Sequence, residues 1–339
     1  MEKTKPLPQK LIKLNILTLE GLAIFLVVLV HFPLPKSVAM FLSYGLPVFI
    51  FARGYQWKER NLKEIISARI LLLETYFTAG ILNTILFLLV VPEQYIVTNW
   101  YNYFLNILLC KTSGNNVAIN VVPLWFFFVI FFSEVLFSLI KNKKLLISIF
   151  ILISFWFRVF LKFPLPFKID LIIMAIPFYL IGYLWKKYQP RVNFLDFLLS
   201  VFGLIIISHF NGHIVWNDAK YGRNGIISFL GEVLAIIIAI YLSKIIKLLQ
   251  LENFFLTFAF NALFVVSYHI SIGGVVALPL IYFFNINDPI KYFEKFWFIN
   301  TPITLTVVWL MIKYTPKKIK LALIGDFRKL INKNNGRSE

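Results

Sequence analysis

The sequence contains few of the residues from which proteins build disulfides and metal sites. Its single cysteine, Cys110, excludes an intramolecular disulfide and a metal site made of several cysteines. Of the four histidines, the closest two are His209 and His213, which flank Asn211 and Gly212. A continuous helix that would present both rings to one ion is doubtful there. The sequence therefore predicts no metal site.

Motifs for nucleotide and cofactor binding are also missing. The chain shows no convincing glycine-rich phosphate loop, GxGxxG sequence or Ser-His-Asp order, so we expect no bound cofactor. Acidic residues are scarce as well, with 16 Asp and Glu against 34 Lys and Arg, and the net charge is +18. Because the basic residues lie between apolar segments, the excess indicates membrane topology, and we expect no nucleic-acid partner.

Long apolar runs dominate what is present. Hydrophobic residues make up 59% of the chain, 37 residues are phenylalanine, and the mean hydropathy is +0.79. No soluble domain of this length has that balance, so the sequence predicts one polytopic all-α membrane domain in a lipid bilayer. Ten segments are long enough, or nearly so, to span about 30 Å as helices. They are residues 12–31, 37–56, 65–91, 121–140, 145–162, 169–185, 194–210, 225–243, 254–276 and 296–314.

Lysine and arginine are distributed unevenly between the two sets of connections. One set contains 23 basic residues and the other contains 8. Because cytoplasmic loops carry the basic excess, both termini are expected in the cytoplasm, with the chain in the plasma membrane. Residues 315–339 would form a basic cytoplasmic tail, either solvated or touching anionic lipid. The basic-rich set comprises 1–13, 57–64, 141–144, 186–193, 244–253 and the end of the chain from 313.

The first apolar segment carries two ionisable residues on one face. Glu20 and His31 are 11 residues apart, which is within about 20° of three helical turns, and the rise between them is about 16 Å. Ionisable residues inside a spanning helix are expensive and suggest a functional site. The alternative is that Glu20 lies near the headgroups and His31 is an interfacial residue. The other histidines, His209, His213 and His269, fall in the same outer half.

Charged residues also interrupt other apolar segments. Glu74, Glu134, Glu232, Arg53 and Arg69 all lie within or beside them. Such residues usually face the bundle interior or a water-filled cavity, so they suggest a polar internal path, or else structural pairs.

Two outer loops are also notable. Residues 92–120 predict a short interfacial helix, and residues 209–224 have the polar and aromatic composition of a carbohydrate-facing surface or of an ordinary solvated loop.

Six motifs occur in order along the chain. They are LTLEGLAIFLVVLVH at 17–31, GLPVFIFARGYQWKER at 45–60, VPLWFFFVIFF at 122–132, PFYLIGYLWKK at 177–187, WNDAKYGRN at 216–224 and NALFVVSYHI at 261–270. With Arg69 entering the third segment, they resemble the motifs of the integral-membrane acyltransferases of the acyltransferase-3 type, which O-acylate sugars and cell-envelope glycans. The branch of sugar O-acetyltransferases is the most similar. The resemblance covers most of the chain.

Two positions depart from the family pattern. Glu20 stands where the family has Arg or Lys, and Arg53 stands where it has the serine of a Ser-Gly-Tyr sequence. Because the first two helices are antiparallel neighbours, we hypothesise a Glu20–Arg53 ion pair in which Arg53 supplies the missing positive charge. An exchange of the two residues, Glu20→Arg with Arg53→Glu, would then retain function.

The resemblance implies an acyl transfer from acyl-CoA, most simply acetyl-CoA, to a hydroxyl of an envelope sugar, polysaccharide or glycolipid. His31 falls on the family's catalytic histidine, and Glu20, on the same helix, is predicted with it as a catalytic residue. His31 would take the hydroxyl proton or carry the acyl group itself. Arg53 and Arg69 would attract the donor's phosphates from the cytoplasmic side. Residues implied at the acceptor are Trp125, His213, Asn217, Tyr221, Arg223, Asn224 and His269.

Three other functions fit the same features. Some members of this superfamily are assigned to polysaccharide export, and a polar path through ten helices would serve that role. A catalytically inactive partner in a capsule-assembly complex would tolerate loss of His31. A proton-coupled transporter is the third alternative. The acceptor sugar, its hydroxyl, the acyl chain, the face of transfer and the oligomeric state do not follow from the sequence.

Overall fold

The computed structural model describes residues 14–32, 34–90, 96, 98–112, 117–283 and 289–330. The N-terminal residues 1–13 and the last residues 331–339, both assigned above to the cytoplasm, lie outside this range. The α-helices are α1 (Ile16–Val30), α2 (Lys36–Leu42), α3 (Pro47–Tyr55), α4 (Leu62–Val90), α5 (Trp100–Leu108), α6 (Trp125–Ile140), α7 (Lys144–Phe160), α8 (Ile169–Tyr188), α9 (Phe194–Asn211), α10 (Gly225–Leu248), α11 (Glu252–Phe260), α12 (Ala262–Phe283), α13 (Pro289–Tyr314) and α14 (Lys317–Leu323).

Short elements connect these helices. Two short antiparallel strands, β1 (Ile214–Val215) and β2 (Lys220–Tyr221), pair Ile214 with Tyr221. They place a small hairpin in the loop 209–224. Helix α5 lies in the predicted loop 92–120, where a short helix was expected. The 3₁₀ helices are η1 (Ser43–Gly45), η3 (Ile119–Leu124), η4 (Pro166–Lys168) and η5 (Trp216–Asp218).

The prediction of an all-α, multi-pass membrane protein agrees with this architecture. Within the described residues, seven helical segments are long and apolar enough to cross a membrane, and α11 with α12 would make an eighth if the bent pair forms one span. Each of the ten predicted segments is helical. However, α1 has 15 residues and α7 has 17, which is short of the roughly 20 that a straight span needs.

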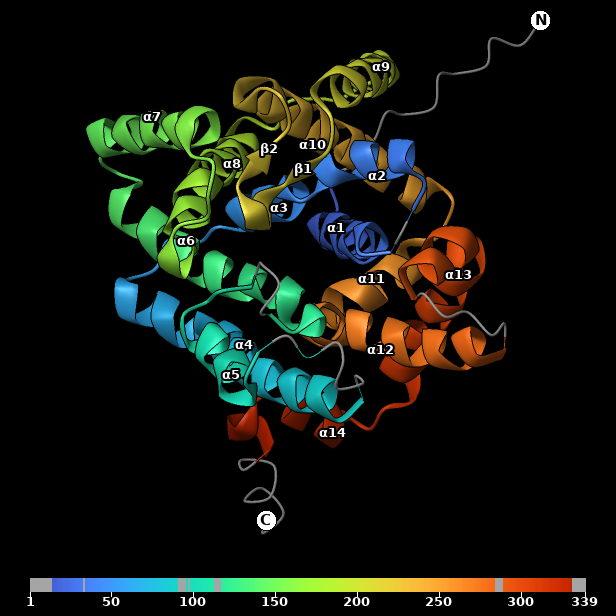
Figure 1. Ribbon diagram of the computed structural model, residues 1–339. Helices are drawn as coiled ribbons and strands as arrows, with labels where there is room; N and C mark the ends of the chain where they lie inside the picture. Colours follow the sequence, from blue (N-terminus) through green and yellow to red (C-terminus); the bar gives the residue numbers. More distant parts are fainter. Residues whose placement is uncertain are drawn as a thin grey trace, which may run out of the picture.

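Helix α1 lies near the centre of the bundle. Figure 1 shows it surrounded by α2, α3, α10 and α11, and it contacts each of them as well as α12. Nine of its 15 residues are buried. Its N-terminus is closed by Asn15, whose side chain accepts a hydrogen bond from the Thr18 backbone. Because neighbouring helices enclose it, a helix of this length need not match the bilayer thickness itself.

The predicted segment 254–276 divides into two helices, because the chain bends there by 89° between α11 and α12. The bend falls at Asn261, whose side chain donates to the Thr257 carbonyl at 2.8 Å. Aromatic packing holds α11 across α1, with Phe25 in edge-on contact with three phenylalanine rings of α11 at 5.7–5.9 Å. Gly21 permits this crossing, since a Cβ there would collide with the backbone of Phe255.

Helices α3 and α8 pack backbone against backbone. A Cβ on Gly54 would collide with the backbone of Tyr179, and one on Gly182 would collide with the backbone of Phe51. Small residues allow this close approach in membrane helices, where packing replaces the hydrophobic effect as the force between helices. The two glycines therefore fix α3, and with it Arg53, against α8.

We expect Gly182→Ala to destabilise the protein by about 1–3 kcal/mol, because the added methyl group must push two backbones apart. Thermal unfolding of the purified protein in detergent measures this. Gly274→Ala is the matched control, since nothing lies within 4 Å of the Cβ it would add. Equal melting temperatures for the two variants would contradict the close backbone contact.

The segment predicted as a cytoplasmic tail begins with a helix that packs on the rest of the protein. Helix α14 and the residues after it pack on the bundle, where the Ile324 carbonyl accepts from Thr75 at 2.8 Å and the Leu323 carbonyl accepts from Tyr268 at 2.7 Å. Arg328 pairs with Glu74 at 3.0 Å on the surface. Glu74 is thereby removed from the predicted polar internal path.

Candidate functional site

Two cavities lie along α1, one toward each end of the helix. We call the first the His31 cavity; it has a volume of about 510 Å³, and its lining includes His31, Trp125, His213, Asn217 and Trp216. The second, the arginine cavity, has about 200 Å³ and includes Glu20, Arg53 and Arg69. Phe126 lines both cavities. The face of α1 that carries Glu20 and His31 thus connects two separate sites.

The ring of His31 is held in one tautomer. His31 follows the last turn of α1, and its Nδ1 lies 2.7 Å from the carbonyl oxygen of Val27. A carbonyl can only accept, so Nδ1 carries the proton and donates it. In the neutral ring, Nε2 then holds a lone pair, and His31 lines the cavity. This is the arrangement that a general base or a nucleophile requires.

The ring of His269, on α12, packs against the ring of His31. The ring centroids are 4.9 Å apart and the planes meet at 66°. Nδ1 of His269 lies 3.0 Å from the Val265 carbonyl, which fixes the same tautomer, and its Nε2 has no hydrogen-bond partner among the described residues. His269 is fully buried and does not line the His31 cavity. His269 therefore contacts the His31 ring and not the cavity itself.

The hairpin loop forms one wall of the His31 cavity, and Thr112, which lies outside this loop, holds it in place. Thr112 holds the Asn217 side chain, which accepts from the Thr112 hydroxyl and donates to the Thr112 carbonyl, both at 2.7 Å. His213 remains in contact with solvent. Packing around its ring and the nearby Lys220 ammonium hold the pKa of His213 below its ordinary value.

Three predicted acceptor residues lie away from this cavity. Tyr221 is buried under Arg158, with the guanidinium 5.5 Å from the ring. Arg223 is exposed at the turn after β2, and Asn224 caps α10 by accepting from the backbones of Ile226 and Ile227. None of the three lines the His31 cavity. Of the residues predicted at the acceptor, Trp125, His213 and Asn217 line the His31 cavity, and His269 contacts the His31 ring.

A buried ion pair supports the hairpin, and only its glutamate is among the residues predicted from the sequence. Arg158 of α7 and Glu232 of α10 are both fully buried and lie 2.8 Å apart. Four aromatic rings surround the guanidinium at 5.2–5.5 Å, from Phe178, Trp216, Tyr221 and Phe229. Trp216 also donates to Glu232 at 2.6 Å. Glu232 therefore belongs to this cluster and not to the predicted internal path; the signal for its partner was an arginine within an apolar run.

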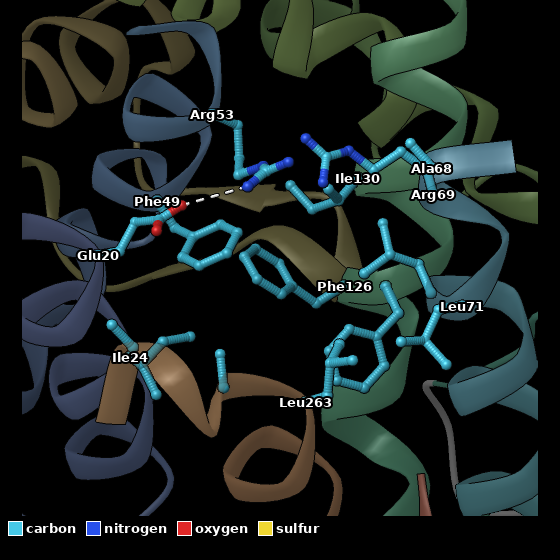
Figure 2. A pocket seen from close by; sticks show the side chains of 14 residues that line it. Glu20, Ile24, Phe49, Arg53, Ala68, Arg69, Leu71, Phe126, Ile130 and Leu263 are labelled. Carbon is cyan, nitrogen blue, oxygen red and sulfur yellow. Dashed lines mark hydrogen bonds and ion pairs between the residues drawn. The ribbon is translucent and has the colours of Figure 1, made fainter. Parts of the chain in front are cut away.

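The hypothesised Glu20–Arg53 ion pair is present in the arginine cavity. Figure 2 shows Glu20 and Arg53 joined across the cavity, with Arg69 reaching toward them from α4. Arg53 lies 3.4 Å from Glu20 and 3.4 Å from Glu134, and Arg69 lies 2.9 Å from Glu134. Two arginines and two glutamates thus form one network without net charge. In the exchange of Glu20 with Arg53, the carboxylate of Arg53→Glu would face Glu134, so we expect the exchanged pair to be less stable than the original.

Glu134 is the carboxylate that both arginines share. We expect Glu134→Gln to destabilise the protein by about 3 kcal/mol, because two largely buried guanidinium groups lose a partner. Glu20→Gln should cost less, since Arg53 keeps Glu134. Thermal unfolding tests both. Glu59→Gln is the control, because the Glu59 partner of Lys141 is 76% exposed, and a cost near zero is expected. A greater loss for Glu20→Gln than for Glu134→Gln would contradict the shared role.

Neither a metal centre nor a relative identifies the site. In the part of the chain that the structure describes, no group of three or more His, Cys, Asp or Glu side chains is placed to hold a metal ion. His209, the fourth histidine, is exposed on α9 and stacks edge-on against Phe210. The chain matches no protein-family model, no curated protein and no solved structure. The function must therefore be argued from the two cavities.

Proposed function

We propose that the protein is a membrane-embedded O-acyltransferase that moves an acyl group, most simply acetyl, from acyl-CoA to a hydroxyl of a cell-envelope sugar, polysaccharide or glycolipid. The observation that carries the proposal is His31. Its tautomer is fixed by Val27, and it lines a cavity that adjoins the arginine cavity at Phe126. In this proposal His31 would act as the base between a polar site for the acceptor and the two arginines that would hold the donor.

In this mechanism Nε2 of His31 removes the proton from the sugar hydroxyl as its oxygen attacks the thioester carbonyl carbon. A C–O bond forms and the C–S bond breaks, and the leaving thiolate then takes the proton from the imidazolium. The alternative uses the same lone pair to attack the thioester first, which gives an acyl-imidazole that the hydroxyl then cleaves. Only the second route leaves the acyl group on the protein when no acceptor is present.

The donor site in this proposal is the arginine cavity. Phosphate oxygens of acyl-CoA would pair with Arg53 and Arg69 in place of Glu20 and Glu134, because guanidinium groups bind phosphate in a bidentate manner. The acyl group would then reach His31 past Phe126, which lines both cavities. In the His31 cavity, the Trp125 ring would offer an aromatic face for a sugar, and the hairpin loop would supply polar contacts.

The orientation in the membrane forms part of the proposal. Ten spans, with the short helices α1 and α7 among them, would place both termini in the cytoplasm of a plasma-membrane protein, as the uneven lysine and arginine distribution predicts. The arginine cavity is then nearer the cytoplasm, where acyl-CoA is made, and the His31 cavity is nearer the outer surface.

The test supplies labelled acetyl-CoA and envelope glycan extract to membranes with and without the protein. Alkali-labile label in the glycan that requires the protein is expected, because an ester is the product. Label on the protein in the absence of glycan would identify the acyl-imidazole route. No label in the glycan would overturn the proposal. If glycan then still reached the outer surface only when the protein was present, export would be the function; an inactive assembly partner would produce neither result.

A further inference from the structure

A third cavity adjoins the His31 cavity at the 3₁₀ turn η5. It has a volume of about 650 Å³, and its lining includes Lys111, Lys168, Lys220 and Asp218. We call it the lysine cavity. Asp218 lines both cavities. Asn217, beside it, lines the His31 cavity, and its backbone carbonyl accepts from Lys168 at 3.0 Å. The two cavities therefore meet at residues 217 and 218.

The walls of the lysine cavity carry a positive excess. The lining contains three ammonium groups and a single carboxylate, that of Asp218, which pairs with Lys220 at 3.2 Å. The nearest further acid, Asp170, does not line the cavity and accepts from the backbone of Leu165 at 3.2 Å. Even when Asp170 is included, the positive charges outnumber the negative ones, which favours an anionic ligand.

Lys168 gives the strongest indication of a ligand. It is 2% exposed, and although Asp170 and Asp218 act on its charge from a distance, neither forms an ion pair with its ammonium group. Buried charges are normally paired, because desolvation of an unpaired charge is costly. The hydrogen bond to Asn217 uses one of three ammonium protons, so two donors remain for an anion. The residue is held by a left-handed backbone with φ of 53° at the start of α8.

We propose that the lysine cavity binds an anionic group, a carboxylate or a phosphate, on the acceptor glycan. The link to the acceptor depends on the proposed function, whereas the binding of an anion does not. Because the two cavities meet at η5, one glycan can place its acidic group beside Lys168 and a hydroxyl of a neighbouring sugar in the His31 cavity. The preferred acceptors are then acidic glycans.

The first experiment measures binding to the full chain in phosphatidylcholine nanodiscs, with glucuronate, glucose 6-phosphate and glucose as probes and without acyl-CoA. We expect both anions to bind and glucose to bind at least about tenfold more weakly, as the loss of one charge-assisted hydrogen bond implies. Equal binding of glucose and glucuronate would overturn the proposal. Because no acyl-CoA is used, this result is separate from the test of acyl transfer.

Variants then assign the binding to the lysine cavity. Lys168→Met should weaken glucuronate binding about tenfold or more. Because a change at a buried lysine can impair folding, Lys111→Gln and Lys220→Gln form a second pair at positions exposed to solvent. Lys162→Gln is the matched control, since Lys162 is exposed nearby but does not line the cavity. Unchanged affinity in both exposed variants would overturn the proposal.

A lipid headgroup is the other source of the same chemistry. If the glycan is the ligand, glucuronate should bind equally well in nanodiscs that contain phosphatidylglycerol. Loss of glucuronate binding in those discs, restored in phosphatidylcholine, would assign the lysine cavity to anionic lipid and overturn the glycan proposal.

Discussion

Replacing His31 with glutamine should reduce the rate of acyl transfer by about 10²–10⁴-fold, the usual contribution of a positioned general base. Glutamine preserves much of the volume and can still donate to the Val27 carbonyl, but it offers no basic nitrogen to the cavity. The measurement is the initial rate of glycan labelling at saturating acetyl-CoA, with thermal unfolding to confirm that the variant folds. The defect should lie mainly in kcat, because the lost interaction acts in the transition state.

His269→Gln is the comparison that separates the two histidines. His269 does not line the His31 cavity and reaches it only through the His31 ring. A smaller loss is therefore expected, and the pH dependence of kcat should change because the neighbour that orients the base has changed. If His269→Gln abolished transfer while His31→Gln retained it, the roles assigned to the two rings would be reversed.

The largest effect on stability is expected at Arg158. Arg158→Met should cost about 3–5 kcal/mol, because Glu232 would remain as an uncompensated buried charge. The double variant Arg158→Met with Glu232→Met should recover much of this loss, since it removes both charges and leaves apolar volume among four aromatic rings. Denaturant unfolding of the wild type, the two single variants and the double variant gives the coupling energy between Arg158 and Glu232.

A surface pair provides the control for that cycle. Arg328 and Glu74 are 54% and 34% exposed, so Arg328→Gln should cost less than about 1 kcal/mol. If Arg158→Met cost no more than Arg328→Gln, the buried pair would not hold α7 to α10. Because Trp216 donates to Glu232, the hairpin wall of the His31 cavity should also loosen when the glutamate is lost.

The sequence predicts the helices well because a spanning segment must satisfy its backbone locally and be apolar over most of its length. Each of the ten predicted segments is helical for this reason. An ion pair between two successive apolar segments could also be predicted from the sequence, as the Glu20–Arg53 pair demonstrates. The bend at Asn261 was not, because it depends on phenylalanine packing between α1 and α11, more than two hundred residues apart in sequence.

Long-range contacts explain the other differences at the site. Glu134 could be identified as a buried acid, but its shared position between Arg53 and Arg69 required three helices to be placed in space. Tyr221 and Asn224 lie in a motif that resembles an acceptor loop, yet their side chains turn toward Arg158 and the start of α10. Sequence motifs place residues in a region, whereas tertiary packing decides which of them face a cavity.

The enclosure of α1 has a consequence for how the protein responds to its membrane. Only Leu17 on this helix is exposed, at 36%, so lipid acyl chains have little contact with the element that separates Glu20 from His31. Changes in bilayer thickness act on outer helices through tilt and local deformation of the lipid. The spacing between the two ends of α1 is instead set by the helix itself, so the distance between the arginine cavity and His31 should be the same in thin and thick bilayers.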